Sequence, residues 1–138
     1  IYVQGNAGYR VGIHMKSYKE MFPTIVIGGK VGDFLGEYQA GGIIIVLGIG
    51  TEGCPVGHFC GTGMHGGEMF IRSETAPRGL PVQVCCAEAT AEEKESIRHY
   101  IDRFVKHFGG NTDELLGSKF YKLTPNSASP YKQLYVNN

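Results

Sequence analysis

The sequence predicts an all-β core in the form of a parallel β-helix, a solenoid with coils of roughly 20–25 residues, followed by an amphipathic helix and an extended tail. The first observation behind this prediction is a tandem repeat: residues 29–48 and 54–73 align without a gap and share one Val, one Phe and four Gly. The second is that the same glycine spacing begins once more at Gly5, 24 residues before Gly29. The third is that each copy ends in an apolar run, as a strand of a buried parallel sheet does.

Glycines at fixed positions in the three units are expected to form the turns of the coils, because glycine adopts positive φ angles at no steric cost. We predict this structural role for Gly5, Gly8, Gly12, Gly29, Gly32, Gly36, Gly41, Gly42, Gly57, Gly61, Gly66 and Gly67. Apolar residues also recur at aligned positions of the three units, and we call each such set a column. The columns are Ala7 with Val31 and Val56, Val11 with Leu35 and Cys60, and Val26 with Val46 and Ile71. Each coil would then add one layer to a continuous apolar interior.

The first unit is predicted to be four residues longer than the others, with the surplus at residues 16–22 as a helical turn or loop. The β-branched residues 24–27 follow Pro23 and predict a strand equivalent to residues 44–47 and 69–72. The Pro- and Gly-containing residues 76–81 mark a boundary. We therefore divide the chain into repeats at residues 1–81 and a last strand, capping helix and tail at residues 82–138, all within one domain.

The carboxyl-terminal part predicts one strand and a clear helix. Residues 82–87 are a candidate strand, and Thr90 with Glu93 forms a capping box that starts a helix over residues 91–108. The apolar positions of that helix recur at helical spacing and are Ile97, Tyr100, Ile101, Phe104, Val105 and Phe108. This stripe must be buried, and we expect the helix to cover the end or side of the repeats.

Beyond that helix the predicted elements are short. Gly109 and Gly110 end the helix, residues 112–116 form a short second helix, and residues 120–123 form a strand or extended segment. The tail from Thr124 onward is expected to run extended over a surface.

Composition excludes several classes of function. Lys plus Arg and Asp plus Glu are both 13, so there is no basic excess for nucleic acid or an anionic membrane. The longest apolar run, residues 43–47, is far shorter than a bilayer span of about 20 residues.

The four cysteines lack a disulfide framework spacing, which predicts reduced thiols and a cytoplasmic protein. Because the chain begins without Met inside the first repeat, we expect an amino-terminal part to be missing here.

A dinucleotide-binding interpretation of Gly61-Thr-Gly63-Met-His-Gly66 is weak. This G-x-G-x-x-G pattern needs a strand before it and a helix after it. Here residues 68–71 after it predict a strand, so a repeat turn is the better interpretation.

Candidate metal ligands and nucleophiles are also unconvincing. His14, His58 and His65, with Cys54 and Cys60, have no C-x-x-C or H-x-x-x-H spacing, although stacked coils could bring them together. Cys60 falls in an apolar column, Cys85 and Cys86 should point to opposite sides of a strand, and Glu92, Glu93 and Glu95 suit the first turn of a helix. We therefore predict no catalytic, cofactor-binding or metal-binding residue in this chain.

Residues 32–48, G-D-F-L-G-E-Y-Q-A-G-G-I-I-I-V-L-G, and residues 61–67, G-T-G-M-H-G-G, resemble the glycine-repeat (GXGXG) domain at the carboxyl end of glutamate synthase large subunits. The resemblance covers residues 5–73. The helix and the P-Y-K-Q-L-Y tail at residues 130–135 are more similar to the stand-alone form of this domain.

The resemblance implies a right-handed parallel β-helix without catalytic residues, which braces a glutamine amidotransferase and a synthase part. FMN and an iron–sulfur cluster would then lie on those partner subunits and not on this chain. The formylmethanofuran dehydrogenase component that is built on a similar repeat, or a component of a related amidotransferase complex, is an alternative. An autonomous protein that binds a metal or small molecule through its histidines is another, and a homo-oligomer fits exposed repeat ends.

Overall fold

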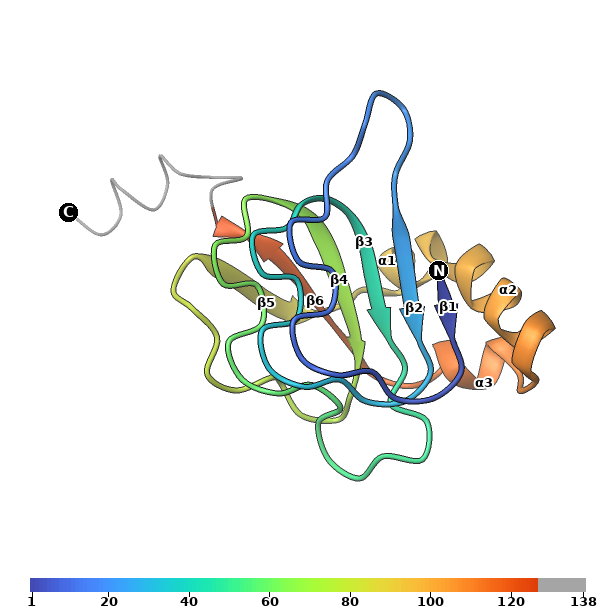
Figure 1. The fold of residues 1–138 in the computed structure, drawn as a ribbon. Coiled ribbons are helices and arrows are strands. Elements are labelled where there is room, and N and C mark those ends of the chain that lie inside the picture. The colour runs from blue at the N-terminus through green and yellow to red at the C-terminus, as the bar shows by residue number, and fades with distance from the viewer. Residues whose placement is uncertain (127–138) are drawn as a thin grey trace.

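A computed structural model describes residues 1–126 of this chain. In chain order the elements are β1 (Tyr2–Val3), β2 (Thr24–Ile27), β3 (Ala40–Val46), β4 (Gly66–Arg72), β5 (Val84–Glu88), α1 (Ala91–Ser96), α2 (Arg98–Phe108), α3 (Thr112–Leu116) and β6 (Phe120–Pro125). The strands form one six-stranded sheet in the order β1-β2-β3-β4-β6-β5 (Figure 1). The extended tail that the sequence predicts begins at Thr124; Thr124 and Pro125 belong to β6, and the part after Asn126 lies outside the described residues.

The sheet is mixed. Strands β1 to β4 pair in parallel with one another, whereas β6 runs antiparallel to both β4 and β5. The parallel strands come one from each glycine-rich unit, preceded by β1, and the two antiparallel strands come from the carboxyl-terminal part. The parallel arrangement requires a long connection between strands, and here each connection consists of turns instead of a helix.

The predicted parallel β-helix is wrong. The described residues form a single open, mixed sheet with three short helices, and not a closed solenoid. Each glycine-rich unit contributes only one strand to this sheet, and residues in the left-handed region, such as Phe34 and Gly36, interrupt the remainder with turns. A repeat period shows that units lie side by side, but it does not show how much of each unit is extended.

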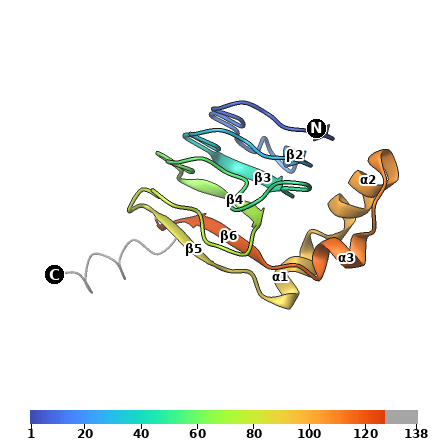
Figure 2. The same ribbon diagram turned by 90° about the horizontal axis from the view of Figure 1, so that it is seen from below.

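Three layers make up the fold. In Figure 2 the strand and connecting turn of each unit are stacked on those of the next unit, and the helices lie beside the sheet. The turns of the three units (residues 5–14, 29–38 and 54–63, the turn ladder) pack on one face of the sheet, and the helices pack on the other. Because side chains alternate along a strand, Ile44 and Val46 face the turn ladder whereas Ile45 faces the helices. Burial on both faces explains why the strand sequences are almost continuously apolar.

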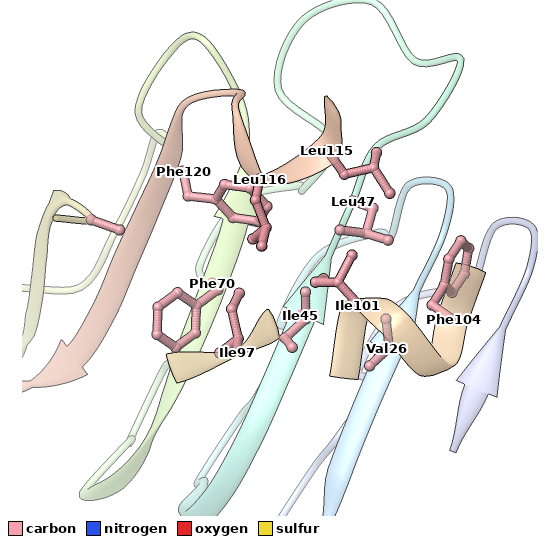
Figure 3. Close-up of a cluster of buried hydrophobic side chains, with 11 residues drawn as sticks. Val26, Ile45, Leu47, Phe70, Ile97, Ile101, Phe104, Leu115, Leu116 and Phe120 are labelled. Atoms are coloured by element: carbon pink, nitrogen blue, oxygen red, sulfur yellow. The ribbon is translucent and has the colours of Figure 1, made fainter. Parts of the chain in front are cut away.

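The helix side of the core is a large apolar cluster (Figure 3). Its buried members are Val26, Ile45, Leu47, Phe70, Ala89, Ile97, Ile101, Phe104, Leu115, Leu116 and Phe120. The predicted apolar stripe of the helix is confirmed, since Tyr100, Val105 and Phe108 also pack against this cluster. The helix covers a face of the sheet, so it lies at the side of the repeats.

The predicted helix over residues 91–108 exists but is interrupted. The capping box is present: Glu93 N–H donates to the Thr90 hydroxyl, and Thr90 N–H donates to the Glu93 carboxylate. At Ile97, with φ −104° and ψ 5°, α1 ends and α2 begins. Gly109, with φ 93°, ends α2 as predicted. Ile97, the residue at this break, is fully buried in the core.

The turn-ladder side of the core confirms two predicted columns. Val11, Leu35 and Cys60 belong to one cluster, as do Ala7, Val31 and Val56, and the Leu35 and Cys60 side chains are fully buried. A third column is wrong by one residue. In the structure Ile27, rather than Val26, lies level with Val46 and Ile71.

The cause of this shift is the loop of the first unit. Gly5 precedes Gly29 by 24 residues, but Thr24 pairs with Ile43, only 19 residues later, so the loop holds five extra residues and not four. A shift of one residue reverses the face on which a side chain lies, which is why Val26 packs against the helices. The loop contains no helical turn; Tyr18 and Met21 form an isolated antiparallel bridge.

Candidate functional site

The most distinctive surface lies along the turn ladder, where side chains of successive units stack; four of them are exposed and Phe34 is half-buried. Arg10, Phe34 and Phe59 occupy equivalent positions in the three units, and all have positive φ angles near 60°. The Arg10 guanidinium lies 4.6 Å from the Phe34 ring centroid, and the Phe34 and Phe59 rings stack at 5.2 Å. A second column stacks His14 on Tyr38 at 5.1 Å. We call these five residues the turn ridge.

The backbone beneath the turn ridge is fixed by hydrogen bonds between units. Arg10 N–H donates to the Asp33 carbonyl at 2.8 Å, and Phe34 N–H donates to the His58 carbonyl at 3.0 Å. His14 N–H donates to the Glu37 carbonyl at 2.8 Å. The ridge therefore presents cationic and aromatic side chains on a backbone that its neighbours hold in place.

Arg10 also makes an ion pair that sequence reasoning missed. Its guanidinium binds the carboxylate of Glu37, a residue of the next unit whose side chain is buried. A buried carboxylate needs a partner of opposite charge, and Arg10 supplies it from the exposed edge. Arg10 and Glu37 lie in neighbouring units but at different positions of the repeat, so the repeat pattern does not predict that they pair.

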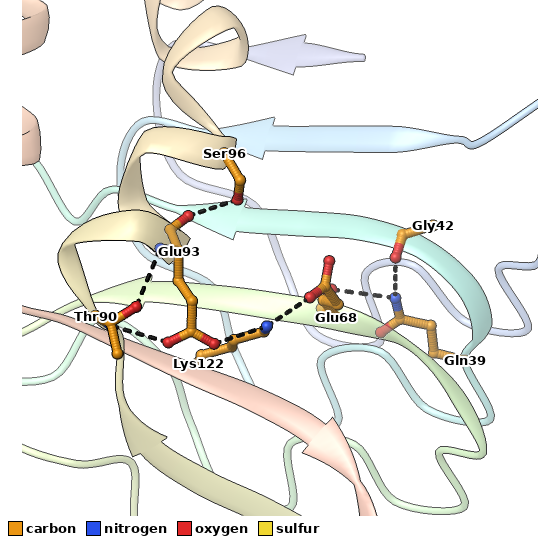
Figure 4. Close-up of polar contacts among 7 residues, drawn as sticks. All are labelled: Gln39, Gly42, Glu68, Thr90, Glu93, Ser96 and Lys122. Atoms are coloured by element: carbon orange, nitrogen blue, oxygen red, sulfur yellow. Dashed lines mark hydrogen bonds and ion pairs between the residues drawn. The ribbon is translucent and has the colours of Figure 1, made fainter. Parts of the chain in front are cut away.

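A polar network joins the helices to the sheet (Figure 4). Lys122 of β6 places its ammonium 2.8 Å from a Glu68 oxygen of β4 and 2.9 Å from a Glu93 oxygen of α1. The hydrogen bond from Lys122, together with that from the Thr90 N–H, lowers the pKa of the Glu93 carboxyl. Burial opposes the charge on Lys122, but its hydrogen bonds to Glu68 and Glu93 prevail and raise its pKa.

Gln39 continues this network towards the glycine-rich start of β3. Its side-chain amide donates to the carbonyls of Gly41 and Gly42 at 3.2 Å, and to that of Glu68 at 3.3 Å. The side chain is fully buried, and its carbonyl oxygen has no hydrogen-bond partner among residues 1–126. Gln39 thus stabilises the irregular pairing between β3 and β4, where the register shifts between Ala40 and Ile43. The sequence pattern does not reveal this role.

The histidines weighed as candidate metal ligands do not come together. His14, His58 and His65 are all exposed, and residues 1–126 contain no group of three or more His, Cys, Asp or Glu side chains arranged to hold a metal ion. His14 stacks on Tyr38, and the His65 ring lies against the Gly63 carbonyl at 3.2 Å.

The cysteines are four free thiols in different environments. Cys60 is fully buried, and burial first, with nearby Cys54 second, raises its pKa to about 12. Burial, followed by Cys54, also raises the pKa of Cys86. Cys85 is exposed on the other side of β5, as the alternation predicts. A thiol with a raised pKa is a poor nucleophile at neutral pH.

The G-x-G-x-x-G segment is a turn followed by a strand. Gly61 and Gly63 have φ angles of 76° and 71°, and β4 starts at Gly66. A Cβ at Gly63 would lie 2.3 Å from the Tyr38 ring, so this glycine accommodates the turn ridge of the preceding unit. The helix that would follow a dinucleotide-binding turn is replaced here by β4.

Two of the open hollows among residues 1–126 lie at the ends of strands β3 and β4. One, of about 260 Å³, lies where β3 and β4 end and includes Arg72, Ser73 and Lys119 in its lining. Arg72 donates to the Ser118 hydroxyl at 3.0 Å and to the Leu47 carbonyl at 2.9 Å, so it connects three segments of the chain. The other, of about 450 Å³, lies beside the glycine-rich start of β3 and is lined by Ser17, Phe22, Ala40, Gly41, Gly42, Ile43, Gly67, Glu68 and Tyr100.

Among residues 1–126, none of the helices has the length and apolar character that a membrane span requires.

Comparison with known proteins supports the resemblance to glutamate synthase only in its broader form. A family model described as the GXGXG motif matches residues 1–128. The chain is 46% identical over 138 residues to uncharacterized protein MJ1350 of Methanocaldococcus jannaschii, an alignment that covers 95% of this chain and 53% of the relative. It is 30% identical over 139 residues to ferredoxin-dependent glutamate synthase 2 of Synechocystis sp., covering 92% of this chain and 8% of that protein.

The chain thus spans about half the length of the first relative and a small part of the second. A relation to formylmethanofuran dehydrogenase is not shown by these matches. The match over residues 1–128 covers the whole sheet, the turn ladder and the helices. The chain belongs to the GXGXG motif family and is homologous to a region of glutamate synthase.

Proposed function

We propose that this chain is a non-catalytic structural domain of a glutamate synthase, which braces a glutamine amidotransferase part and a flavin- and iron–sulfur-containing synthase part. Homology to a region of a ferredoxin-dependent glutamate synthase supports the assignment to this kind of assembly. The observation that carries the bracing role is the turn ridge, a largely exposed stack of cationic and aromatic side chains on a fixed backbone. Aromatic and Arg side chains are the types that most often dominate binding at protein interfaces.

The energetics of the turn ridge favour a binding role over a stabilising one. A bulky residue with positive φ costs about 1–3 kcal/mol, and Phe34, Tyr38 and Phe59 all have such angles. Tyr38 and Phe59 nevertheless leave 45% and 47% of their surface exposed, so burial within this chain compensates only in part. Asn or Gly would adopt the same backbone more easily. Contact with a partner would supply the missing burial.

The test is co-purification of this chain with the candidate amidotransferase and synthase subunits. Co-elution with both subunits is the expected result, with flavin and iron–sulfur absorbance following the synthase subunit and absent from this chain purified alone. Elution of the chain apart from both subunits would overturn the proposed function.

A double variant tests whether the contact with the partner lies on the turn ridge. Phe59→Asn with Tyr38→Asn should weaken binding to at least one subunit by about tenfold or more, because interface aromatics commonly contribute over 1 kcal/mol each. The same variant should be folded and no less stable, since Asn tolerates positive φ. Val82→Asn, at a position 87% exposed before β5, is the matched control and should leave binding unchanged.

A further inference from the structure

The hollow at the carboxyl ends of β3 and β4 has a polar lining that the proposed bracing role does not use. Its volume is about 260 Å³. Its lining comes from the loop after β3, from the end of β4 with the turn that follows, and from the residues before β6; Thr51, Arg72 and Lys119 belong to these three segments. We call it the strand-end hollow. Basic and hydroxyl side chains dominate the lining, and both kinds of group bind anions.

Arg72 carries a positive charge that has no carboxylate partner among residues 1–126. The residue is half-buried, and two of its guanidinium nitrogens bind neutral oxygens. Nε donates to the Ser118 hydroxyl at 3.0 Å, and Nη1 donates to the Leu47 carbonyl at 2.9 Å. The third nitrogen, Nη2, donates to no acceptor in the described part of the chain. Arg72 is therefore held in place by its neighbours while one end of its guanidinium remains available.

Two other half-buried basic residues show the usual solution to this problem. Arg98 and Lys122 each contact two carboxylates. A guanidinium keeps its proton at every pH at which proteins are folded, so it cannot avoid the cost of burial by becoming neutral. A charge removed from water without a partner of opposite sign is costly. An anion beside Arg72 would therefore stabilise it.

The other charges near Arg72 are mostly positive as well. The Lys94 ammonium donates to the Ser118 carbonyl at 3.0 Å, on the same residue whose hydroxyl binds Arg72. Lys119 lines the hollow, and its ion pair with the carboxylate at the end of β5 is long, at 3.9 Å. Glu74 is the acidic residue of the lining, and it is exposed to water. The balance of charge around the hollow is therefore positive.

The hollow also has neutral hydrogen-bond donors. The Thr51 and Thr75 hydroxyls form no hydrogen bond within residues 1–126, and the Gly53 N–H has no acceptor there. The Ser73 hydroxyl, in contrast, is engaged, because it donates to the Thr75 carbonyl at 2.6 Å and accepts from the Thr75 N–H at 3.2 Å. A ligand in the hollow would thus meet two cationic groups, two hydroxyls and a backbone N–H.

We propose that the strand-end hollow binds the phosphate group of a small phosphorylated molecule, with Nη2 of Arg72 as its charged donor. A phosphate ester carries almost two negative charges at neutral pH and has three acceptor oxygens, so it can use both cations and the neutral donors together. A carboxylate has one charge and two oxygens and would leave part of this set unused. The volume of about 260 Å³ lies below the roughly 300–1,000 Å³ of drug-sized ligand sites, which favours a small ligand.

This inference does not depend on the proposed glutamate synthase role. The strand-end hollow contains no residue of the turn ridge, and phosphate binding is measured on this chain alone. Failure of co-purification would leave the phosphate site untouched, and failure of phosphate binding would leave the bracing role untouched. The competing occupants of the hollow are a carboxylate and a phosphorylated side chain of a partner protein.

The test is an NMR titration of the isotope-labelled chain at matched ionic strength. The probes are inorganic phosphate, glycerol phosphate, acetate and a phosphoserine peptide, and the signals followed are the Arg72 Nε–H and the Gly53 amide. We expect saturable shifts of both signals with phosphate and glycerol phosphate. Acetate should bind at least about fivefold more weakly, because it has fewer charges and acceptor oxygens. Glycerol phosphate should bind at least as tightly as the peptide.

Lys119→Gln tests the site with less risk to the fold than a change of Arg72, which connects three segments of the chain. It should weaken phosphate binding by about threefold, the effect of a partly exposed charge. Glu74→Gln should strengthen binding by about the same factor, because it removes the negative charge of the lining. Arg103→Gln, an exposed change on α2 outside the lining, is the matched control and should leave binding unchanged.

Several results would overturn the proposal. One is the lack of a saturable shift at Arg72 and Gly53 with either phosphate or glycerol phosphate. Another is equal affinity for phosphate and acetate, or an equal loss of phosphate affinity in Lys119→Gln and Arg103→Gln, because the attraction would then come from general charge. Tighter binding of the phosphoserine peptide than of glycerol phosphate would assign the hollow to a partner protein instead.

Discussion

At the scale of single residues, the glycines of the repeat are required for different physical reasons. Gly36 has a φ angle of 66°, which most side chains avoid, whereas Gly57 has an ordinary angle but no room for a Cβ. Gly5 shows neither constraint within the described residues. All three glycines belong to the same repeated pattern in the sequence, and the pattern does not show which of these requirements each one meets.

This difference predicts opposite effects of the same substitution. Gly57→Ala should destabilise the fold by about 1–3 kcal/mol, because its Cβ would clash with the side chain and backbone of Asp33. Gly5→Ala should be neutral or stabilise by up to about 1 kcal/mol, since it reduces the entropy of the unfolded chain. Urea unfolding of the two variants checks this; similar losses in both would contradict it.

The buried thiol of Cys60 predicts a reactivity order and an alkaline pH dependence. Its pKa is raised from 9.0 to about 12, so the folded state keeps the proton while the unfolded state loses it above about pH 9. Stability linked to Cys60 is therefore fully present below pH 9 and falls as the pH rises from 9 towards 12. Cys60→Ala should lack this slope in denaturation measured against pH.

Thiol labelling provides the matching control. Exposed Cys85 should react with a thiol reagent in the folded protein, and Cys60 only after unfolding. Labelling of Cys60 at the rate of Cys85 would show that its site is open.

At the scale of elements, Lys122 joins α1 to the sheet through Glu93 and Glu68. Glu93 has a lowered pKa, caused first by the Lys122 hydrogen bond. A depressed carboxyl pKa stabilises the fold above the unfolded value of about 4.5, and this contribution is lost as the pH falls through the folded pKa.

Glu93→Gln tests this connection because Gln can retain the capping box while it removes the charge. We expect a loss of up to about 1 kcal/mol at pH 7 that shrinks as the pH falls below 4.5. Glu92→Gln, an exposed change in the same turn, should cost less than about 0.5 kcal/mol. A pH-independent loss in Glu93→Gln would point to packing instead of charge.

At the scale of the whole molecule, the same apolar runs serve two separate cores. Residues 43–47 alternate between the helix-covered face and the turn-ladder face, and both faces exclude water. The single open sheet depends on this double cover, since neither layer alone could bury both sides of the strands. The mixed strand order follows from the carboxyl-terminal part, which adds β6 and β5 antiparallel to the last parallel strand.

The sequence by itself determined the repeating units, the strand in each unit, the apolar stripe and capping box of the helix, and the family. These are local patterns: hydrophobic period, glycine spacing and cap chemistry can all be counted along the chain. Only the tertiary structure decided the open mixed sheet, the one-residue register of β2, the break at Ile97 and the pairs formed by Arg10 and Lys122. Each of these depends on contacts between residues far apart in sequence, where neither period nor spacing fixes the partner.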